Sequence, residues 1–433
     1  MPKTNNGTIR MIRDAEIEHR CILPINAAQK QYAYRCVKSG TFVRTFRNLY
    51  AQTEYWQKLY TSERIRHVAL SLIDLYPDWK FTVTSGAALL GYDVVEDYDT
   101  LFVGSKYDSQ KMNLQTLPTQ IYIRSKINKS THDNPQLHRI RATGKEQDAT
   151  SDDVRIVQPS RKYDGQLITL PHSSDRVSYE IRSHVVDKST LLFDAANSLS
   201  FRAALPIFDS AARDNVNFNK VLEICERRDG GRDGGRDGGR DGGRDGAVGV
   251  GGSGVVGNGF VYSCVAGFGS NVDPIFRLRR LCLFKNGLSE NGGESFARGT
   301  MIDLGFMVPE LQHEFVSPNF RVKYRCDFLW RVSGGGLIVG ELDGYDKYFV
   351  DSTNSSHVNI NFNSSADTQM LRNSYNQAAI NRNIDRQAER ESVLFRECGV
   401  SKIVRFNFAD VVGVKNLERK LVEAGVPRIM RVG

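Results

Sequence analysis

Four carboxylates and one lysine in the last third of the chain are residue types that could hold a metal ion and act on a phosphate. They are Glu294, Asp327, Glu341, Asp343 and Lys347. If folding brings them together, the like charges repel and raise one another's pKa, and a hard divalent cation such as Mg²⁺ is the natural compensation. A Mg²⁺ ion held by the four carboxylates could activate water, while the lysine orients that water or contacts the phosphate. The set therefore predicts Mg²⁺-dependent phosphodiester hydrolysis.

Three local elements must position these side chains. In GGESFARGTMIDLGF the residues Glu294, Ala297, Met301 and Leu304 are spaced 3, 4 and 3, which predicts a helix that turns Glu294 inward. Alternation in RVKYRCDFLW predicts a strand with Asp327 on its polar face, and GLIVGELD predicts the next strand. The SGGG turn at 333–336 puts Asp327 opposite Glu341, within about one residue of register.

Each carboxylate also has a simpler interpretation. Glu294 in the first turn of a helix suits the helix dipole, and carboxylates on a hairpin can form a solvated acidic rim. Short motifs recur by chance, so spacing alone leaves these alternatives open. Arg405, on the predicted strand VRFNF, contacts phosphate in one interpretation and forms a structural ion pair in the other.

A basic segment lies near the N-terminus. From Gln29 to Arg66, eight basic residues stand against two acidic ones, a local charge of +6. Asn26 can cap a helix that Gly40 ends, with a buried stripe of Ala28, Tyr32 and Cys36. A short hairpin follows. Helix, turn, basic helix and basic hairpin is the order of a winged helix, in which the helix enters the major groove and the hairpin reaches phosphate or the minor groove. The predicted DNA contacts are Lys30, Arg35, Lys38, Arg44 and Arg47.

From charge alone, a solvated basic face on a small helical unit is the favoured interpretation of this segment. The whole chain has 433 residues and a net charge of +8, which favours a polyanionic partner only modestly.

The seven cysteines are scattered without a C-x-x-C pair, which argues against a zinc site of common spacing and for reduced thiols. We find no signal peptide and no apolar stretch that would span a membrane, so the expected location is the cytoplasm, without a membrane partner.

A repeat divides the chain. RDGG recurs in tandem from Arg228 and passes into a glycine-rich run to Gly259. Such a segment has no apolar side chains to bury, and it predicts a coil spanning on the order of 30 Å. Each arginine is followed by aspartate, which favours a spacer over an RNA-binding tract. The expected α/β (α+β) architecture has four parts: a winged-helix-like domain (1–60), an α/β middle domain (61–226), a flexible linker (227–259), and a C-terminal mixed sheet flanked by helices (260–433).

The C-terminal part resembles the very-short-patch-repair endonucleases, a branch of the PD-(D/E)XK nuclease superfamily. The resemblance covers 289–410 and rests on GGESFARGTMIDLGF, ELQ at 310–312, RCDFLW, GELDGYDKY and ERESVLFRECGVSKIVRFNFAD. It implies a metal site formed by Glu294, Asp327 and Glu341. The chain departs from the superfamily at Asp343, where an E-x-K motif has lysine. Lys347 is displaced toward the next turn, which leaves cleavage open.

The N-terminal half resembles AbiE-type antitoxins of the bacterial type IV toxin–antitoxin systems. The carrying segments are KSGTFVRTFRNLYA, TSGAALLGYDV and DKSTLLFDAANSLSFRAALPIFDSAAR. The resemblance implies a winged helix that binds operator DNA and represses its own promoter. Two functions are therefore expected: a DNA-binding protein with a Mg²⁺-dependent endonuclease site, or a non-enzymatic repressor and antitoxin. The second would have a nucleotidyltransferase-like toxin as partner. Neither interpretation gives the oligomeric state.

Overall fold

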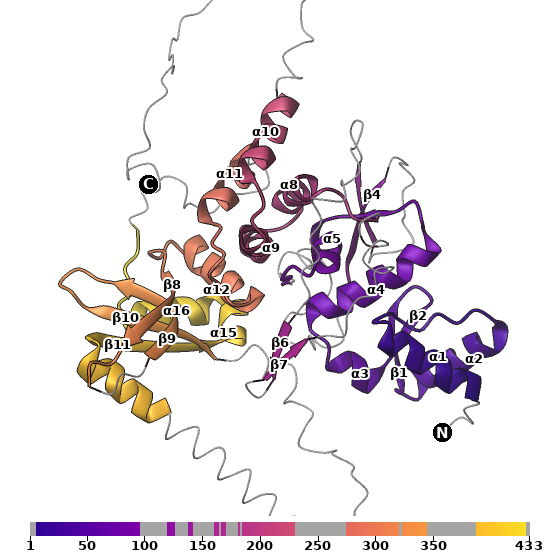
Figure 1. Ribbon diagram of the computed structural model, residues 1–433, viewed down its shortest axis with the longest axis horizontal. Coiled ribbons are helices and arrows are strands. Elements are labelled where there is room, and N and C mark those ends of the chain that lie inside the picture. The colour runs from indigo at the N-terminus through magenta and orange to yellow at the C-terminus, as the bar shows by residue number, and fades with distance from the viewer. Residues whose placement is uncertain are drawn as a thin grey trace, which may run out of the picture.

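The computed structural model describes residues 6–95, 119–125, 137–141, 160–163, 166–169, 181, 184–229, 274–319, 323–343 and 387–429. Over these residues the protein is mixed α/β. The N-terminal elements and the C-terminal sheet lie on opposite sides, with a group of helices between them (Figure 1). Lys347 and the predicted linker beyond Asp229 lie outside the described residues. No helix in the described part of the chain is long and apolar enough to cross a membrane.

The first unit has two helices and a hairpin: α1 (Asn6–Ile17), α2 (Ala27–Lys38), β1 (Phe42–Phe46) and β2 (Leu49–Gln52). The Asn26 side chain caps α2 by accepting from the Gln29 backbone N at 2.9 Å, as predicted. The buried stripe differs from the prediction. Ala33 and Cys36 are buried and Ala28 is exposed, because Ala28 lies in the first turn, beyond the reach of this unit's small core.

The middle region consists of α3 (Thr53–Gln57), α4 (Thr61–Leu75), β3 (Lys80–Phe81), α5 (Val83–Leu90), β4 (Ile121–Ser125), β5 (Leu137–Arg141), the hairpin β6 (Ser160–Tyr163) and β7 (Gln166–Thr169), α8 (Lys188–Ser198), α9 (Phe201–Arg213) and α10 (Phe218–Asp229). Three of its strands form a short sheet in the order β3-β4-β5. Arg124 of this sheet forms a buried ion pair with Asp194 of α8, with Nε and Oδ2 2.7 Å apart. The last helix continues past the predicted start of the linker at 227, because the first glycine of the repeat is residue 230.

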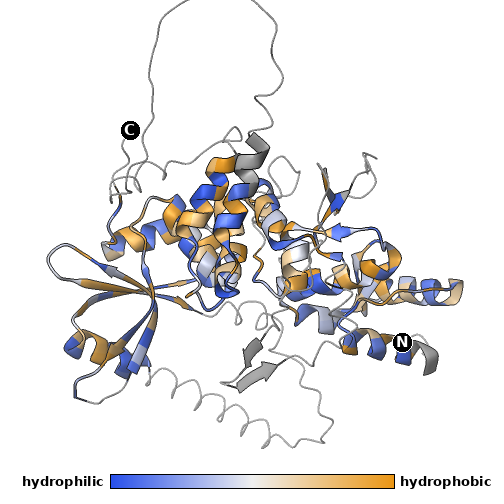
Figure 2. Cartoon of the chain, turned by 45° about the horizontal axis from the view of Figure 1, so that its top comes forward, coloured by the Kyte–Doolittle hydropathy of each residue, from blue (hydrophilic) through white to orange (hydrophobic). Residues whose placement is uncertain are grey.

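Two helices beyond the repeat tract pack into the same core as the middle region. They are α11 (Pro274–Phe284) and α12 (Gly292–Asp303). Leu278 and Leu281 of α11 belong to the hydrophobic core that includes Leu205 and Phe208 of α9. Figure 2 shows hydrophobic residues along the helices in the middle of the molecule. The residues on the two sides of the repeat tract therefore share one core.

The contact between α12 and α9 depends on a glycine and a buried ion pair. A Cβ on Gly299 would lie 2.8 Å from the Arg202 Cα, so only glycine permits this approach. One residue earlier, Arg298 Nη2 donates to both carboxylate oxygens of Asp209 at 2.8 and 2.7 Å. Both side chains are almost completely buried. Residues 292–302 of α12 are consequently all buried, whereas the sequence pattern predicted one inward face.

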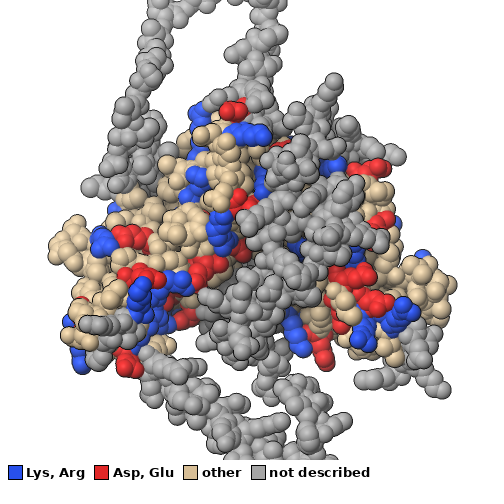
Figure 3. Space-filling view, in the orientation of Figure 1, with Lys and Arg blue, Asp and Glu red and all other residues tan. Residues whose placement is uncertain are grey.

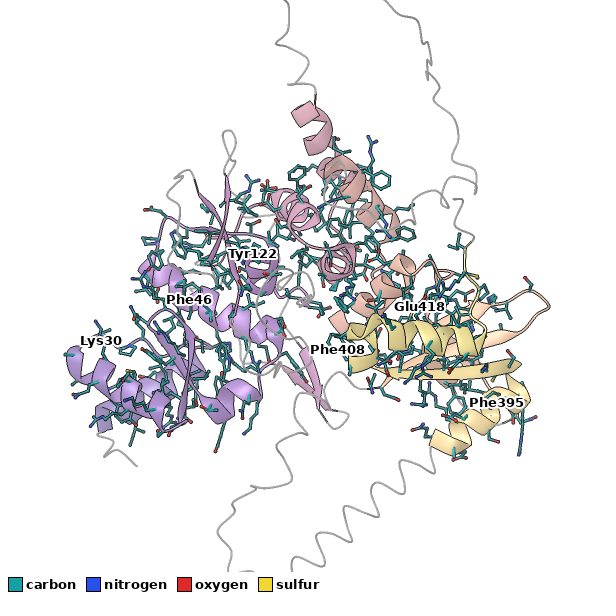
Figure 4. All side chains as sticks on the ribbon, turned by 180° about the vertical axis from the view of Figure 1, so that it is seen from behind. Lys30, Phe46, Tyr122, Phe395, Phe408 and Glu418 are labelled. Carbon is teal, nitrogen blue, oxygen red and sulfur yellow. The ribbon has the colours of Figure 1, made fainter. Side chains whose placement is uncertain are left out.

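The C-terminal sheet has strand order β11-β10-β9-β8 and is mixed: β8, β9 and β10 are antiparallel, and β11 runs parallel to β10. Hydrophobic residues of α12, α15 and α16 share a core with strand residues that include Phe328 and Phe406. Leu394, on the helix at 387–397, belongs to a second core with strand residues that include Leu329 and Val339. Figure 4 shows the sheet between α16, where Glu418 is labelled, and the helix that carries Phe395. The elements are β8 (Glu310–Val316), β9 (Lys323–Arg331), β10 (Leu337–Asp343), β11 (Val400–Asn407), α15 (Phe408–Val412) and α16 (Val414–Ala424).

Candidate active site in the C-terminal sheet

Asp327 and Glu341 lie opposite each other on neighbouring strands. The β9–β10 pairing runs from Arg331↔Leu337 to Phe328↔Gly340, and the next pair in this register is Asp327 with Glu341. The turn at 333–336 contains two glycines with positive φ, at 92° and 86°. The hairpin register that the sequence predicted is therefore confirmed.

Asp327 interacts with carboxylates on both sides. Its Oδ2 accepts a hydrogen bond from the Leu342 backbone N at 2.8 Å. Burial raises the pKa of Asp327, and the Leu342 N–H and the nearby Arg390 act against this increase. The Asp327 charge in turn raises the pKa of Glu294 and of Glu341. Asp327 is thus electrostatically coupled to a carboxylate on a helix and to one on a strand.

Glu294 reaches this cluster from the first turn of α12. It is 3% exposed, and its backbone N donates to the Asn291 side chain that caps the helix. Its carboxylate accepts three hydrogen bonds at 2.8 Å, from the Glu290 backbone N, Asn291 Nδ2 and Gln312 Nε2. Burial first, and then the Asp327 charge, raise its pKa to about 8. The predicted inward orientation of Glu294 is confirmed.

Gln312 of the ELQ segment is the strand residue that meets Glu294. Its φ is +53°, in the left-handed region that non-glycine residues seldom adopt within a strand. While its Nε2 donates to Glu294, its Oε1 is buried and has no hydrogen-bond partner among the described residues. An unsatisfied buried amide oxygen is costly and is a suitable ligand for a hard cation.

Glu341 is paired with an arginine that the sequence analysis did not identify. Arg390, on the helix at 387–397, donates from Nη2 to Glu341 Oε1 at 2.6 Å and to the Arg325 carbonyl O at 2.6 Å. Burial and Asp327 raise the pKa of Glu341 to about 7, against the lowering effect of Arg390. The available signal was the ERES segment, one of those that carry the nuclease resemblance, but nothing local links it to Glu341.

Asp343 and Arg405 contact each other instead of joining the buried carboxylates. Arg405 Nη1 lies 2.5 Å from Asp343 Oδ1, and its Nε lies 3.1 Å from Glu391 Oε1. The Asp343 side chain is 50% exposed. The structural ion pair, which the sequence left open for Arg405, is thus present.

The donor chemistry suits a Mg²⁺ site, because Glu294 and Glu341 are buried carboxylates, Asp327 is a half-buried one, and Gln312 supplies an amide oxygen. In the described part of the chain, however, no three His, Cys, Asp or Glu side chains are grouped closely enough to hold one metal ion. Arg390 and the hydrogen bonds to Glu294 instead compensate the carboxylates. Binding of a cation would therefore require at least the Arg390 guanidinium to move.

The predicted DNA contacts are on the surface of the first unit. Lys30, Arg35, Lys38, Arg44 and Arg47 are all exposed. Figure 4 places Lys30 at the outer end of the unit. Two other arginines that contributed to the local charge of +6 face inward. Arg64 Nε donates to the Trp56 carbonyl O at 3.0 Å, and Arg66 Nη1 donates to the Leu89 carbonyl O at 2.7 Å.

Acidic and basic side chains lie intermixed on the C-terminal part of the face drawn in Figure 3. Comparison with family models, curated proteins and solved structures gave no match to this chain.

Proposed function

We propose that this chain is a DNA-binding protein whose C-terminal sheet carries a Mg²⁺-dependent phosphodiesterase site. The observation that carries the proposal is the position of Asp327, which lies opposite Glu341 on the neighbouring strand and within electrostatic reach of Glu294 on α12. Mutually repelling carboxylates are unfavourable in a buried site without a cation, and carboxyl groups whose pKa is raised in this way are enriched at functional sites.

The mixed sheet with helices on both sides supports assignment of the C-terminal part to the PD-(D/E)XK fold. Glu294, Asp327 and Glu341 would hold Mg²⁺, which would activate water and neutralise charge on the phosphate. Asp343 is paired with Arg405 and would become a Mg²⁺ ligand only if that ion pair opened. Lys347 is assigned to the phosphate or its water by its proximity in sequence to Asp343.

The helix, helix and hairpin order of residues 6–52 supports a winged helix as the DNA-binding part. The five exposed basic residues would contact the DNA backbone and grooves. This proposal follows the resemblance of the N-terminal half to AbiE-type antitoxins, which implies a winged helix that binds operator DNA.

A second candidate function is favoured by the contact between Arg390 and Glu341. If that ion pair is permanent, the sheet is a binding module, and the chain is a non-enzymatic transcriptional repressor and antitoxin. A nucleotidyltransferase-like toxin would then be its partner.

Plasmid cleavage distinguishes the two functions. The full chain is incubated with supercoiled plasmid in millimolar Mg²⁺ or in EDTA, beside the variant Asp327→Ala. The nuclease proposal expects cleavage by the parent with Mg²⁺ only, and none by the variant, whose thermal unfolding should remain cooperative. A parent that never cuts, and whose melting temperature is the same with and without Mg²⁺, supports the repressor.

A further inference from the structure

The N-terminal half of the chain reaches the candidate active site. Asp93 lies on the segment after α5, and Arg213 is the last residue of α9. Both contact the residues that lead into α12: Arg213 donates to backbone carbonyl oxygens of the preceding loop, and Asp93 packs against Gly292. Both residues belong to the other side of the repeat tract from Glu294.

Arg213 binds the loop that precedes α12. Its Nη1 donates to the carbonyl oxygens of Ser289 and Glu290 at 3.1 and 3.2 Å. Its Nη2 donates to Ser210 Oγ at 2.9 Å and to the Asp93 carboxylate. One guanidinium thus joins α9, the segment at 93 and the loop at 286–291.

The same loop holds the Glu294 carboxylate. The Glu290 backbone N, in the residue whose carbonyl oxygen binds Arg213, donates to Glu294 Oε2 at 2.8 Å. Glu290 also pairs through its carboxylate with Arg325 of β9. Arg213 is therefore one hydrogen-bonded residue away from Glu294.

Adjacent contacts keep Arg213 in place. Asp214 Oδ2 accepts from the Tyr92 hydroxyl at 2.6 Å and from Lys188 Nζ at 2.6 Å. At the start of α12, a Cβ on Gly292 would lie only 3.0 Å from the Asp93 Cβ, so the backbone of α12 packs directly on this segment.

We propose that Arg213, supported by Asp93, is a positioning residue for Glu294, so that the N-terminal half completes the active site. The inference rests on the proposed nuclease function for its catalytic consequence. Its structural part, that Arg213 fixes the loop at 286–291, stands on the hydrogen bonds alone. Through these contacts, correct folding of the N-terminal half determines where the Glu294 carboxylate lies.

The test uses the full-length variant Arg213→Met, which keeps the aliphatic stem and removes the guanidinium. Arg331→Met is the matched control, because Arg331 also forms a carboxylate pair, with Glu310, and lies at the end of β9, four residues from Asp327. Two measurements are made on each: hydrogen exchange of peptides that cover 286–294, and DNA cleavage at varied DNA and Mg²⁺ concentrations.

We expect Arg213→Met to speed exchange at 286–294 and to lower kcat, or the apparent Mg²⁺ affinity, about 10- to 100-fold. The KM for DNA should change little, because the basic face at 30–47 is intact, and Arg331→Met should match the parent. Unchanged exchange, or cleavage equal to the parent, overturns the inference. A parent that never cuts refutes the nuclease function, and the exchange result then decides the positioning role by itself. If Arg213→Met is poorly folded, Asp93→Ala gives the same test with a smaller expected loss.

Discussion

Arg390 Nη2 lies 2.6 Å from Glu341 Oε1, although the two residues are 49 positions apart in the chain. The guanidinium comes from the helix at 387–397 and compensates a buried strand carboxylate that also faces Asp327. A cation bound by Glu341 would replace this ion pair. Arg390 would then be released toward whatever anion approaches the cation.

Asp327→Asn should stabilise the metal-free protein at alkaline pH. Folding raises the pKa of Glu341 from 4.5 to about 7, so the folded chain binds protons that the unfolded chain has released, and stability falls as pH rises through this window. Removal of the Asp327 charge lowers this folded pKa, and Asn can still accept from the Leu342 N. In EDTA we expect a gain on the order of 1–2 kcal/mol at pH 8 that disappears toward pH 4.5.

Chemical denaturation from pH 4.5 to pH 8 measures this gain. Asp343→Asn is the control, because it removes a charge from a half-exposed pair and should change stability by less than about 1 kcal/mol at any pH. An Asp327→Asn curve parallel to that of the parent would show that the carboxylates are not coupled.

Arg298→Met should be among the most damaging single substitutions in the chain. It leaves Asp209 buried without its charged partner, and breaking such a pair typically costs about 3–5 kcal/mol. Adding Asp209→Asn should restore part of the loss, since no uncompensated charge then remains. Urea unfolding of the two singles and the double measures the coupling. A loss below about 1 kcal/mol would contradict the buried location of this pair.

Removing basic residues from the first unit should flatten the salt dependence of DNA binding. In the variant, Ala replaces Lys30, Arg35, Arg44 and Arg47. Loss of four phosphate contacts lowers the slope of log K against log salt by about 3 to 4. The charge-matched control replaces by Ala four exposed basic residues of the C-terminal part: Arg331, Lys402, Lys415 and Arg419. Equal slopes for the variant and the parent in a fluorescence titration would place the DNA surface elsewhere.

Cutting the repeat tract should leave the protein assembled. Proteolysis within 230–259 separates the chain covalently, but α11 and α12 remain packed on α8 and α9. We expect two bands on a denaturing gel and one species, at the position of the intact chain, in native size-exclusion chromatography. Two separate native peaks would mean that this shared core is not enough to hold the parts together.

Local patterns were sufficient to predict much of the C-terminal hairpin. Alternation in RVKYRCDFLW and the glycine turn determine the register that places Asp327 opposite Glu341. Helix α12 was predicted from its spacing, but its complete burial was not. Arg298 and Gly299 look like surface residues in isolation, and their contacts with Asp209 and Arg202 join residues about ninety positions apart. A metal site was predicted from residue type and stays a prediction. The contact of Arg390 with Glu341 depends on tertiary packing that no local pattern records.

The two ends of the repeat tract are attached to the same core, because α10 ends at Asp229, α11 begins at Pro274, and these two helices contact each other. The residues between Asp229 and Pro274 therefore connect two helices that the shared core holds together. Each doubling of a flexible loop adds only about 0.6 kcal/mol to the entropic cost of closing it. Chains that differ in the number of RDGG units should therefore form the same shared core with nearly the same stability.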